Sequence, residues 1–176
     1  MKLDGKVALI TGAGTGIGTA IAKRFVADGA KICITGRRQE MLDEVAQSLP
    51  VGTVVTCAGD VTKLKDAKRM AETALGFAGK LDVLVNNAAI DPGGTTVVDL
   101  DPDLWHRVLE TNLTGPMYLM KASIPHMIKG GGGSIINIAS LGGLRCLPGM
   151  PAYCSSKAGL IMHTQQVALD FGPAKI

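Results

Sequence analysis

Short apolar runs alternate with longer stretches of helical periodicity along the whole chain, and this alternation limits the folds that it can adopt. The apolar runs are expected to form strands at residues 7–10, 31–35, 53–57, 81–85 and 134–139. Helices are expected at residues 17–29, 39–49, 63–77, 102–128 and 153–171, the fourth of them interrupted by Pro116 and Pro125. Strands that are apolar on both faces are typical of a parallel sheet between two layers of helices. The pattern therefore predicts a doubly wound, Rossmann-type α/β fold.

The composition and charge are those of an ordinary globular chain. Its 176 residues are 47% apolar and 19% charged, and this length suits a single domain over residues 1–176. A net charge of +3 is too small to indicate a nucleic-acid partner, and no run approaches the ~20 apolar residues of a membrane span. The four cysteines include no CxxC pair and the three histidines are scattered, so no metal site is expected. Because residues 1–6 lack the apolar core of a signal peptide, a cytoplasmic protein is expected.

A glycine-rich loop follows the first expected strand and opens the first expected helix. Its glycines are Gly12, Gly16 and Gly18, with Thr15 and Ile17 between them. Glycines in this position permit a tight turn and let backbone N–H groups approach a pyrophosphate, which the positive end of the helix dipole also attracts. A tight turn without a ligand is the alternative, but the placement between a buried strand and an amphipathic helix favours a dinucleotide site. We therefore expect these five residues to bind a cofactor.

The loop has the spacing TGxxxGIG and resembles that of the short-chain dehydrogenase/reductase family. Further motifs like those of the family follow in order: Asp60-Val61 after the third strand, Asn86-Asn87-Ala88-Ala89 after the fourth, Asn112 in the long helix, and Ser140 after the fifth strand. Tyr153 stands 13 residues after Ser140, and Lys157 completes a YxxxK pair. The chain departs from the family in having Thr19 where Arg is frequent and Ala89 in place of the usual Gly.

The resemblance implies an oxidoreductase that transfers a hydride between a nicotinamide dinucleotide and a secondary alcohol or ketone. Tyr153 is then the general acid/base, and Lys157 stabilises its deprotonated form and holds the nicotinamide ribose. Ser140 hydrogen-bonds the substrate oxygen, and Asn112 interrupts its helix to hold a water that relays protons to Lys157. A spacing of four residues in a helix also puts Tyr153 and Lys157 on one face, although such a pair alone is usually a half-buried ring and a solvated amine. The cofactor contacts that the resemblance implies are those of Asp60, Val61, Asn86, Ala88, Tyr153 and Lys157.

The end of the second expected strand bears on the choice of cofactor. Members of the family that use NAD commonly carry an acid there, which binds the ribose 2′-hydroxyl. This chain has Gly36 at that position, followed by Arg37 and Arg38. A guanidinium group offers the fixed donors that suit a 2′-phosphate, so NADP(H) is favoured, with Arg37 as the binding residue and Arg38 in reserve. NAD(H) stays open as the cofactor, because a loop arginine can also stack on adenine.

The chain ends at Ile176, directly after the last expected helix. Members of the family usually continue into a sixth strand, a substrate-binding segment and a seventh strand, so the resemblance implies a C-terminally truncated fold that lacks them. Two interpretations follow: an enzyme acting on a small-molecule alcohol or ketone, or a non-catalytic nucleotide-binding form or fragment of such an enzyme. In the family, the helices that correspond to residues 102–128 and 153–171 commonly pair across a two-fold axis, and a homodimer or homotetramer is therefore expected.

Overall fold

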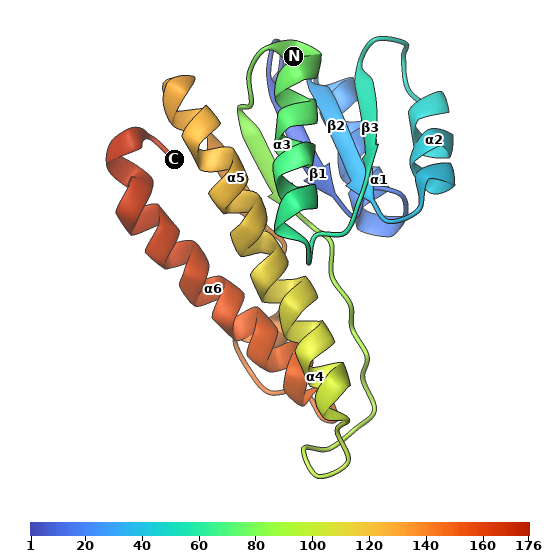
Figure 1. The fold of residues 1–176 in the computed structure, drawn as a ribbon, viewed down its shortest axis with the longest axis vertical. Helices are drawn as coiled ribbons and strands as arrows, with labels where there is room; N and C mark the ends of the chain where they lie inside the picture. The colour runs from blue at the N-terminus through green and yellow to red at the C-terminus, as the bar shows by residue number, and fades with distance from the viewer.

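The protein is described over residues 1–176 by a computed structural model. Its strands are β1 (Val7–Thr11), β2 (Lys31–Gly36), β3 (Val54–Ala58), β4 (Val83–Asn86) and β5 (Ser134–Asn137). They form one parallel sheet in the order β3-β2-β1-β4-β5 (Figure 1). The chain thus runs outward from β1 in one direction to β3 and then in the other direction to β5. The predicted doubly wound, Rossmann-type sheet is confirmed.

The helices are α1 (Gly16–Ala27), α2 (Gln39–Gln47), α3 (Leu64–Ala78), α4 (Pro102–Leu109), α5 (Gly115–Lys129) and α6 (Pro151–Phe171). Helical structure covers the predicted residues 102–128, but the interruption predicted at Pro116 and Pro125 is wrong. The α-helix instead ends at Leu109, and a π-helical turn, Glu110–Thr114, joins α4 to α5. Pro116 lies in the first turn of α5, directly after the π-helical turn, and Pro125 lies inside α5 without ending it.

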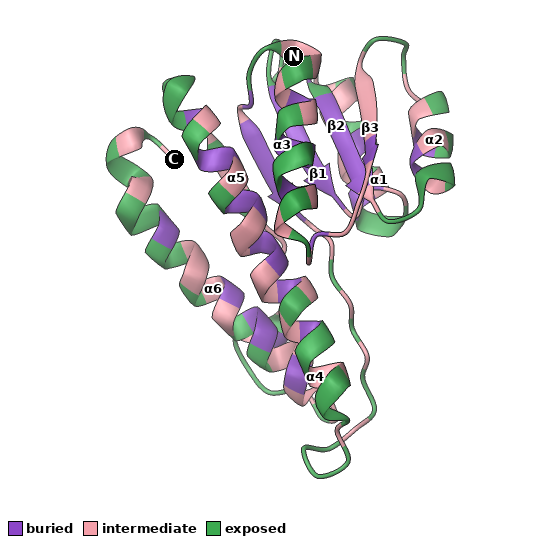
Figure 2. Ribbon diagram, viewed as in Figure 1, coloured by how far each residue is buried: buried purple, intermediate pink, exposed green.

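The two faces of the sheet bury different apolar clusters. Successive side chains of β1 point to opposite faces, so Leu9 packs in one cluster with residues of α3 and α5. Ala8 and Ile10 pack in the other cluster with residues of α1 and α2. Helices α3 and α5 therefore cover one face and α1 and α2 the other, and Figure 2 shows the central strands buried between them.

The burial of β5, at one edge of the sheet, differs from that of the central strands. All residues of β1 and β4 are buried, whereas those of β5 alternate between exposed and half-buried, and Ile136 is 40% exposed. Helix α6 contacts β5, α4, the π-helical turn and the 3₁₀ turn Leu141–Gly143. This end of the molecule is thus packed less completely than the centre of the sheet.

Candidate active site

The loop between β1 and α1 needs glycine at specific positions. Gly12 has a φ of +63°, in the left-handed region, and a Cβ there would lie 2.9 Å from Ala88 Cα. A Cβ on Gly18 would overlap the Gly12 carbonyl oxygen and lie 2.7 Å from Asn87 Nδ2. Gly12 thus permits the turn, and Gly18 lets α1 pack directly against the loop. The N-terminus of α1 at Gly16 consequently lies at the wall of a cleft.

A network around Thr11 joins this loop to the segment after β4. The Thr11 hydroxyl donates to the Val85 carbonyl (3.3 Å) and accepts from the backbone N–H groups of Asn87 and Ala88 (3.0 Å each). The side-chain amide of Asn87 donates to the carbonyls of Thr11 (2.9 Å) and Gly12 (3.2 Å). These bonds fix Ala88 beside the glycine loop. The role of Asn87 was not predicted, although it lies in the motif that drew attention to its neighbours.

The cleft lies at the carboxyl ends of the strands, at the point where the strand order reverses. Its volume is about 610 Å³, which is within the range of roughly 300–1,000 Å³ for small-molecule sites. The glycine loop, the segments after β2, β3 and β4, and the start of the π-helical turn line it. The predicted cofactor-binding residues that line the cleft are Gly12, Thr15, Gly16, Ile17, Arg37, Asp60, Val61 and Ala88.

The other predicted cofactor-binding residues lie outside the walls of this cleft. Gly18 is buried behind the glycine loop. Asn86 is also buried, and its side-chain amide donates to Asn137 Oδ1 on β5 (2.8 Å). Tyr153 and Lys157 lie on α6. Their contacts with a cofactor stay predictions.

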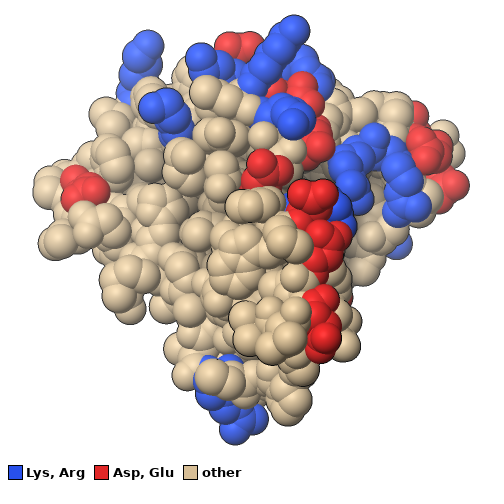
Figure 3. All heavy atoms as spheres, turned by 60° about the horizontal axis from the view of Figure 1, so that its bottom comes forward, with Lys and Arg blue, Asp and Glu red and all other residues tan.

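Basic side chains outnumber acidic ones around the cleft. The charged residues that line it are Arg37, Arg38, Lys63, Arg107, Asp60 and Glu110. Arg37 and Arg38 are exposed, and neither forms an ion pair in the chain. Figure 3, which brings the lower side of Figure 1 forward, shows a group of Lys and Arg at the right, on the side of α2. Unpaired guanidinium groups at a cleft are suited to binding phosphate.

Tyr153 and Lys157 are separated by one turn of α6. Lys157 is 3% exposed, and its Nζ donates to the Ile138 carbonyl (2.6 Å) and lies 5.7 Å from the centre of the Tyr153 ring. Burial lowers the pKa of Lys157, and the charge of Asp91 acts in the opposite direction. The half-buried tyrosine ring thus has a buried amine beside it.

Asn112 connects the cleft to α6. It lies in the π-helical turn and is completely buried. Its Oδ1 accepts from the Ile90 N–H (2.8 Å), and its Nδ2 donates to the Ile90 carbonyl (2.9 Å) and the Ser156 hydroxyl (3.1 Å). Ile90 lines the cleft, and Ser156 directly precedes Lys157. Residue 116, which would donate to the Asn112 carbonyl in a regular α-helix, is proline and has no N–H.

Ser140 follows β5 and begins the 3₁₀ turn that leads to α6. Its Oγ accepts from the Gly142 N–H (3.1 Å). A Cβ on Gly142 would lie 3.5 Å from Ser140 Oγ and 3.3 Å from Cys154 Sγ, and a Cβ on Gly143 would lie 2.8 Å from the backbone of Lys157. Because both glycines allow this close approach, Ser140 is held near the N-terminal turns of α6.

None of the helices has the combination of length and hydropathy that a membrane crossing requires. Nowhere do three or more His, Cys, Asp or Glu side chains converge as they would around a metal ion.

A glycine-rich loop at the reversal point of a doubly wound sheet is typical of nucleotide-binding α/β proteins. A profile of the family described as short chain dehydrogenase matches residues 6–176. The chain is 34% identical over 177 residues to dehydrogenase/reductase SDR family member 4 of Homo sapiens, which covers 99% of this chain and 63% of that protein. It is 36% identical over 172 residues to meso-2,3-butanediol dehydrogenase of Serratia marcescens, which covers 98% of this chain and 68% of that protein.

The chain therefore belongs to the short-chain dehydrogenase/reductase family of oxidoreductases, whose cofactors are nicotinamide nucleotides. It spans 63% of the length of the human relative.

Proposed function

We propose that the chain is an oxidoreductase that transfers a hydride between NADP(H) and a secondary alcohol or ketone. The observation that carries this proposal is the buried amine of Lys157, 5.7 Å from the centre of the Tyr153 ring. A nearby ammonium stabilises a phenolate, and a phenol that can lose and regain its proton serves as a general acid/base. Asn112 supports the same proposal, because its bonds to Ile90 and Ser156 join this pair to the cleft.

In this proposal, a bound nicotinamide dinucleotide supplies or accepts the hydride, and the chain's own residues handle the proton. Tyr153 donates its hydroxyl proton to the forming alkoxide, or withdraws one from the alcohol in the opposite direction. Ser140 hydrogen-bonds the same oxygen and stabilises the charge that develops on it. Since burial lowers the pKa of Lys157, its ammonium releases a proton more readily than a solvated lysine, which suits it to restore the proton of Tyr153.

The backbone carbonyl oxygen of Asn112 is suited to bind a water of a proton relay. Both hydrogens of its side-chain amide are already used, by the Ile90 carbonyl and the Ser156 hydroxyl. Its backbone carbonyl lacks the helical donor that residue 116 would provide if it were not proline. We assign this carbonyl, rather than the side chain, to a water that relays protons to Lys157.

The cleft suits the cofactor in shape and charge. Gly12 places no side chain at the wall of the cleft, where a Cβ would lie 2.9 Å from Ala88 Cα. The N-terminus of α1 favours binding of a pyrophosphate. Asp60 and Val61 then lie beside the adenine, and Arg37 binds a 2′-phosphate. No acid stands at the end of β2 to repel that phosphate, because Gly36 occupies the position, and this favours NADP(H) over NAD(H).

We propose one domain over residues 1–176, located in the cytoplasm and assembled as a homodimer or homotetramer through α4, α5 and α6. The exposed apolar side chains of Met162 and Leu169 on α6 support such an interface. The substrate is proposed to be a small-molecule alcohol or ketone.

The test is turnover by the 176-residue chain. The chain spans 63% of the length of its human relative, so its activity without further residues is itself part of the proposal. Nicotinamide absorbance is followed with NADPH or NADH and a panel of aliphatic, cyclic and aromatic ketones. Oxidation of NADPH with at least one ketone is expected. Binding of NADPH without turnover of any ketone would favour a non-catalytic nucleotide-binding form, and a chain that binds neither cofactor would contradict the proposal altogether.

A further inference from the structure

The segment between β3 and α3 carries two of the predicted cofactor contacts, Asp60 and Val61. Strand β3 ends at Ala58 and α3 begins at Leu64, so residues 59–63 belong to neither a helix nor a strand, yet all five line the cleft. Such a segment keeps a single binding geometry only when other residues fix its backbone.

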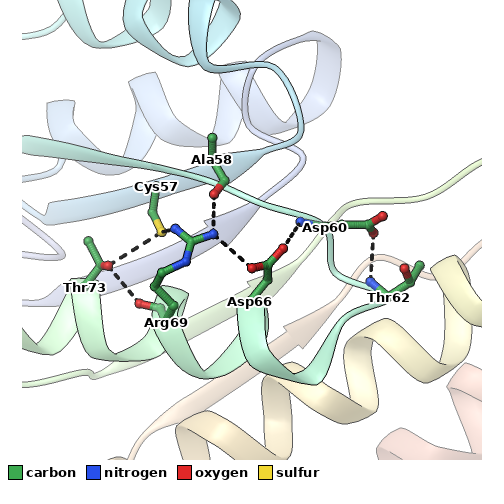
Figure 4. Close-up of polar contacts among 7 residues, drawn as sticks. All are labelled: Cys57, Ala58, Asp60, Thr62, Asp66, Arg69 and Thr73. Atoms are coloured by element: carbon green, nitrogen blue, oxygen red, sulfur yellow. Dashed lines mark hydrogen bonds and ion pairs between the residues drawn. The ribbon is translucent and has the colours of Figure 1, made fainter.

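Two side chains of α3 fix this backbone from outside the cleft. Asp66 Oδ2 accepts from the Asp60 N–H (2.9 Å), and Arg69 Nη2 donates to Asp66 Oδ1 (3.0 Å) and to the Ala58 carbonyl (2.7 Å). Arg69 Nη1 also donates to Cys57 Sγ (3.0 Å). Figure 4 shows the guanidinium between the end of β3 and the Asp66 carboxylate. Neither Asp66 nor Arg69 lines the cleft.

The segment lies directly against these two side chains. A Cβ on Gly59 would lie 2.9 Å from Arg69 Nη2 and 3.2 Å from Asp66 Cγ. Hydrogen bonds from the Asp60 N–H and from Arg69 lower the pKa of Asp66, so its contacts are those of a carboxylate at neutral pH. On the other side of the same backbone, Asp60 Oδ1 accepts from the Thr62 N–H (2.9 Å), which orients the carboxylate of Asp60.

We propose that Arg69 and Asp66 are positioning residues that hold Asp60 and Val61 in the geometry that binds the adenosine half of the cofactor. This inference rests on the proposed function, because it requires a nicotinamide dinucleotide in the cleft. The bonds of Arg69 and Asp66 reach β3 and residues 59–63 but not the glycine loop or α6. Their removal therefore weakens the adenosine half and leaves the nicotinamide half unchanged.

The experiment compares two probes on the 176-residue chain by calorimetric titration. Adenosine 2′,5′-bisphosphate represents the adenosine half, and reduced nicotinamide mononucleotide represents the other half. Asp66→Ala and Arg69→Ala should each raise the Kd of the adenosine probe about tenfold. Both should leave the Kd of the mononucleotide within about twofold of the original value, since that half is distant from the change. Arg69→Lys should restore the adenosine affinity only in part, because lysine keeps the charge but lacks the fork that bonds several acceptors.

Two control variants separate this effect from a general loss of surface charge. Arg24→Ala breaks the ion pair with Asp28 at the C-terminus of α1 (2.7 Å), which also lies at the surface but away from the cleft. Lys68→Ala removes an exposed charge from α3 itself. Neither should change the affinity for either probe. Amide hydrogen exchange without ligand should quicken in residues 59–63 of Asp66→Ala and Arg69→Ala, while α3 stays protected.

The outcomes separate this inference from the proposed function. If the original chain binds both probes and the Asp66→Ala and Arg69→Ala variants bind them equally well, the positioning role is refuted and the proposed function stands. Equal weakening of both probes would indicate a general structural role and would likewise overturn the inference. If the original chain binds neither probe, the proposed function and this inference fail together. Should the alanine variants not fold, Asp66→Asn and Arg69→Lys apply the same test, with smaller losses confined to the adenosine probe.

Discussion

The cleft and the α6 end of the molecule, which carries the proposed catalytic residues Ser140, Tyr153 and Lys157, are held in place by different kinds of contact. The cleft residues follow strands of the sheet, and hydrogen bonds from other segments fix them, such as those from Asn87 to Thr11 and from Arg69 to Ala58. Tyr153 and Lys157 lie on α6 and Ser140 begins the turn before it, next to β5, where Ile136 is 40% exposed. Binding and turnover should therefore depend on separate contacts, and single substitutions should separate them.

The largest expected effect is on turnover, from Tyr153→Phe. Removal of one hydroxyl takes away the proposed acid/base while the ring still packs beside Lys157. We expect kcat to fall by roughly 10²–10⁴-fold, the usual contribution of a general acid/base, with the Kd of NADPH largely unchanged. Turnover and fluorescence titration of NADPH on the same sample measure both quantities.

The matched control is Tyr118→Phe, since Tyr118 is the other tyrosine of the chain and packs against the core from α5. It should keep its turnover. Near-normal activity of Tyr153→Phe, or an equal loss in both variants, would show that Tyr153 is not the acid/base.

The next effect is on binding and stability together, from Gly18→Ala. The new Cβ would overlap the Gly12 carbonyl and approach Asn87 Nδ2 to 2.7 Å, so α1 and the loop have to move apart. Overpacking of this kind costs about 1–3 kcal/mol of unfolding free energy, and NADPH binding should be lost because the glycine loop changes shape. Urea unfolding and NADPH titration measure the two effects.

The contrasting variant is Gly76→Ala in α3, where a Cβ would meet nothing within 4 Å. It should stabilise the chain by about 0.5–1 kcal/mol, because alanine favours a helix over glycine, and it should leave NADPH binding unchanged. If Gly18→Ala bound NADPH as well as Gly76→Ala does, the close packing of α1 would not be needed for the cleft.

A smaller and more selective effect is expected from Arg37→Ala. Arg37 is exposed and forms no ion pair, so its loss should leave the fold intact and remove only a contact with the 2′-phosphate. The Kd of NADPH should rise about tenfold, while the Kd of NADH stays nearly constant. Arg24→Ala serves as the control on α1. Parallel changes for the two cofactors would contradict a role for Arg37 in choosing between them.

Most of the fold could be predicted because short stretches of the sequence indicate each strand and helix by themselves. The central strands are continuous apolar runs since both of their faces are buried, and such runs are visible in the sequence itself. The π-helical turn Glu110–Thr114 was not predicted from periodicity. It includes Asn112, whose side chain bonds the backbone of Ile90, a contact between segments that no helical period reveals. A proline within a helical pattern predicts an interruption, but Pro116 lies in the first turn of α5.

The candidate site was predicted where motifs lie in loops at the ends of strands, and less well where side-chain direction matters. Asn86 and Asn87 are neighbours in one motif, but Asn86 is the last residue of β4 and its amide bonds Asn137 on β5. Asn87 begins the loop and bonds the segment at Gly12. Which of two adjacent asparagines faces the cleft depends on the residue at which the strand ends, and sequence patterns place that boundary only approximately.

The smallest expected effect is a pH dependence of stability that comes from Lys157. Burial lowers its pKa in the folded chain, so the unfolded chain binds this proton more tightly. Unfolding then takes up a proton between the two pKa values, and the unfolding free energy rises with pH in that window. The original chain should therefore gain stability relative to Lys157→Met as the pH is raised from neutral toward the usual lysine pKa of about 10.4. Urea unfolding of both proteins over this range measures the difference, and Lys121→Met, which alters an exposed lysine on α5, should show no such trend. A constant difference between the original chain and Lys157→Met would mean that the amine beside Tyr153 is as well solvated as a surface lysine, and the contrast between the α6 end and the cleft would lose its electrostatic basis.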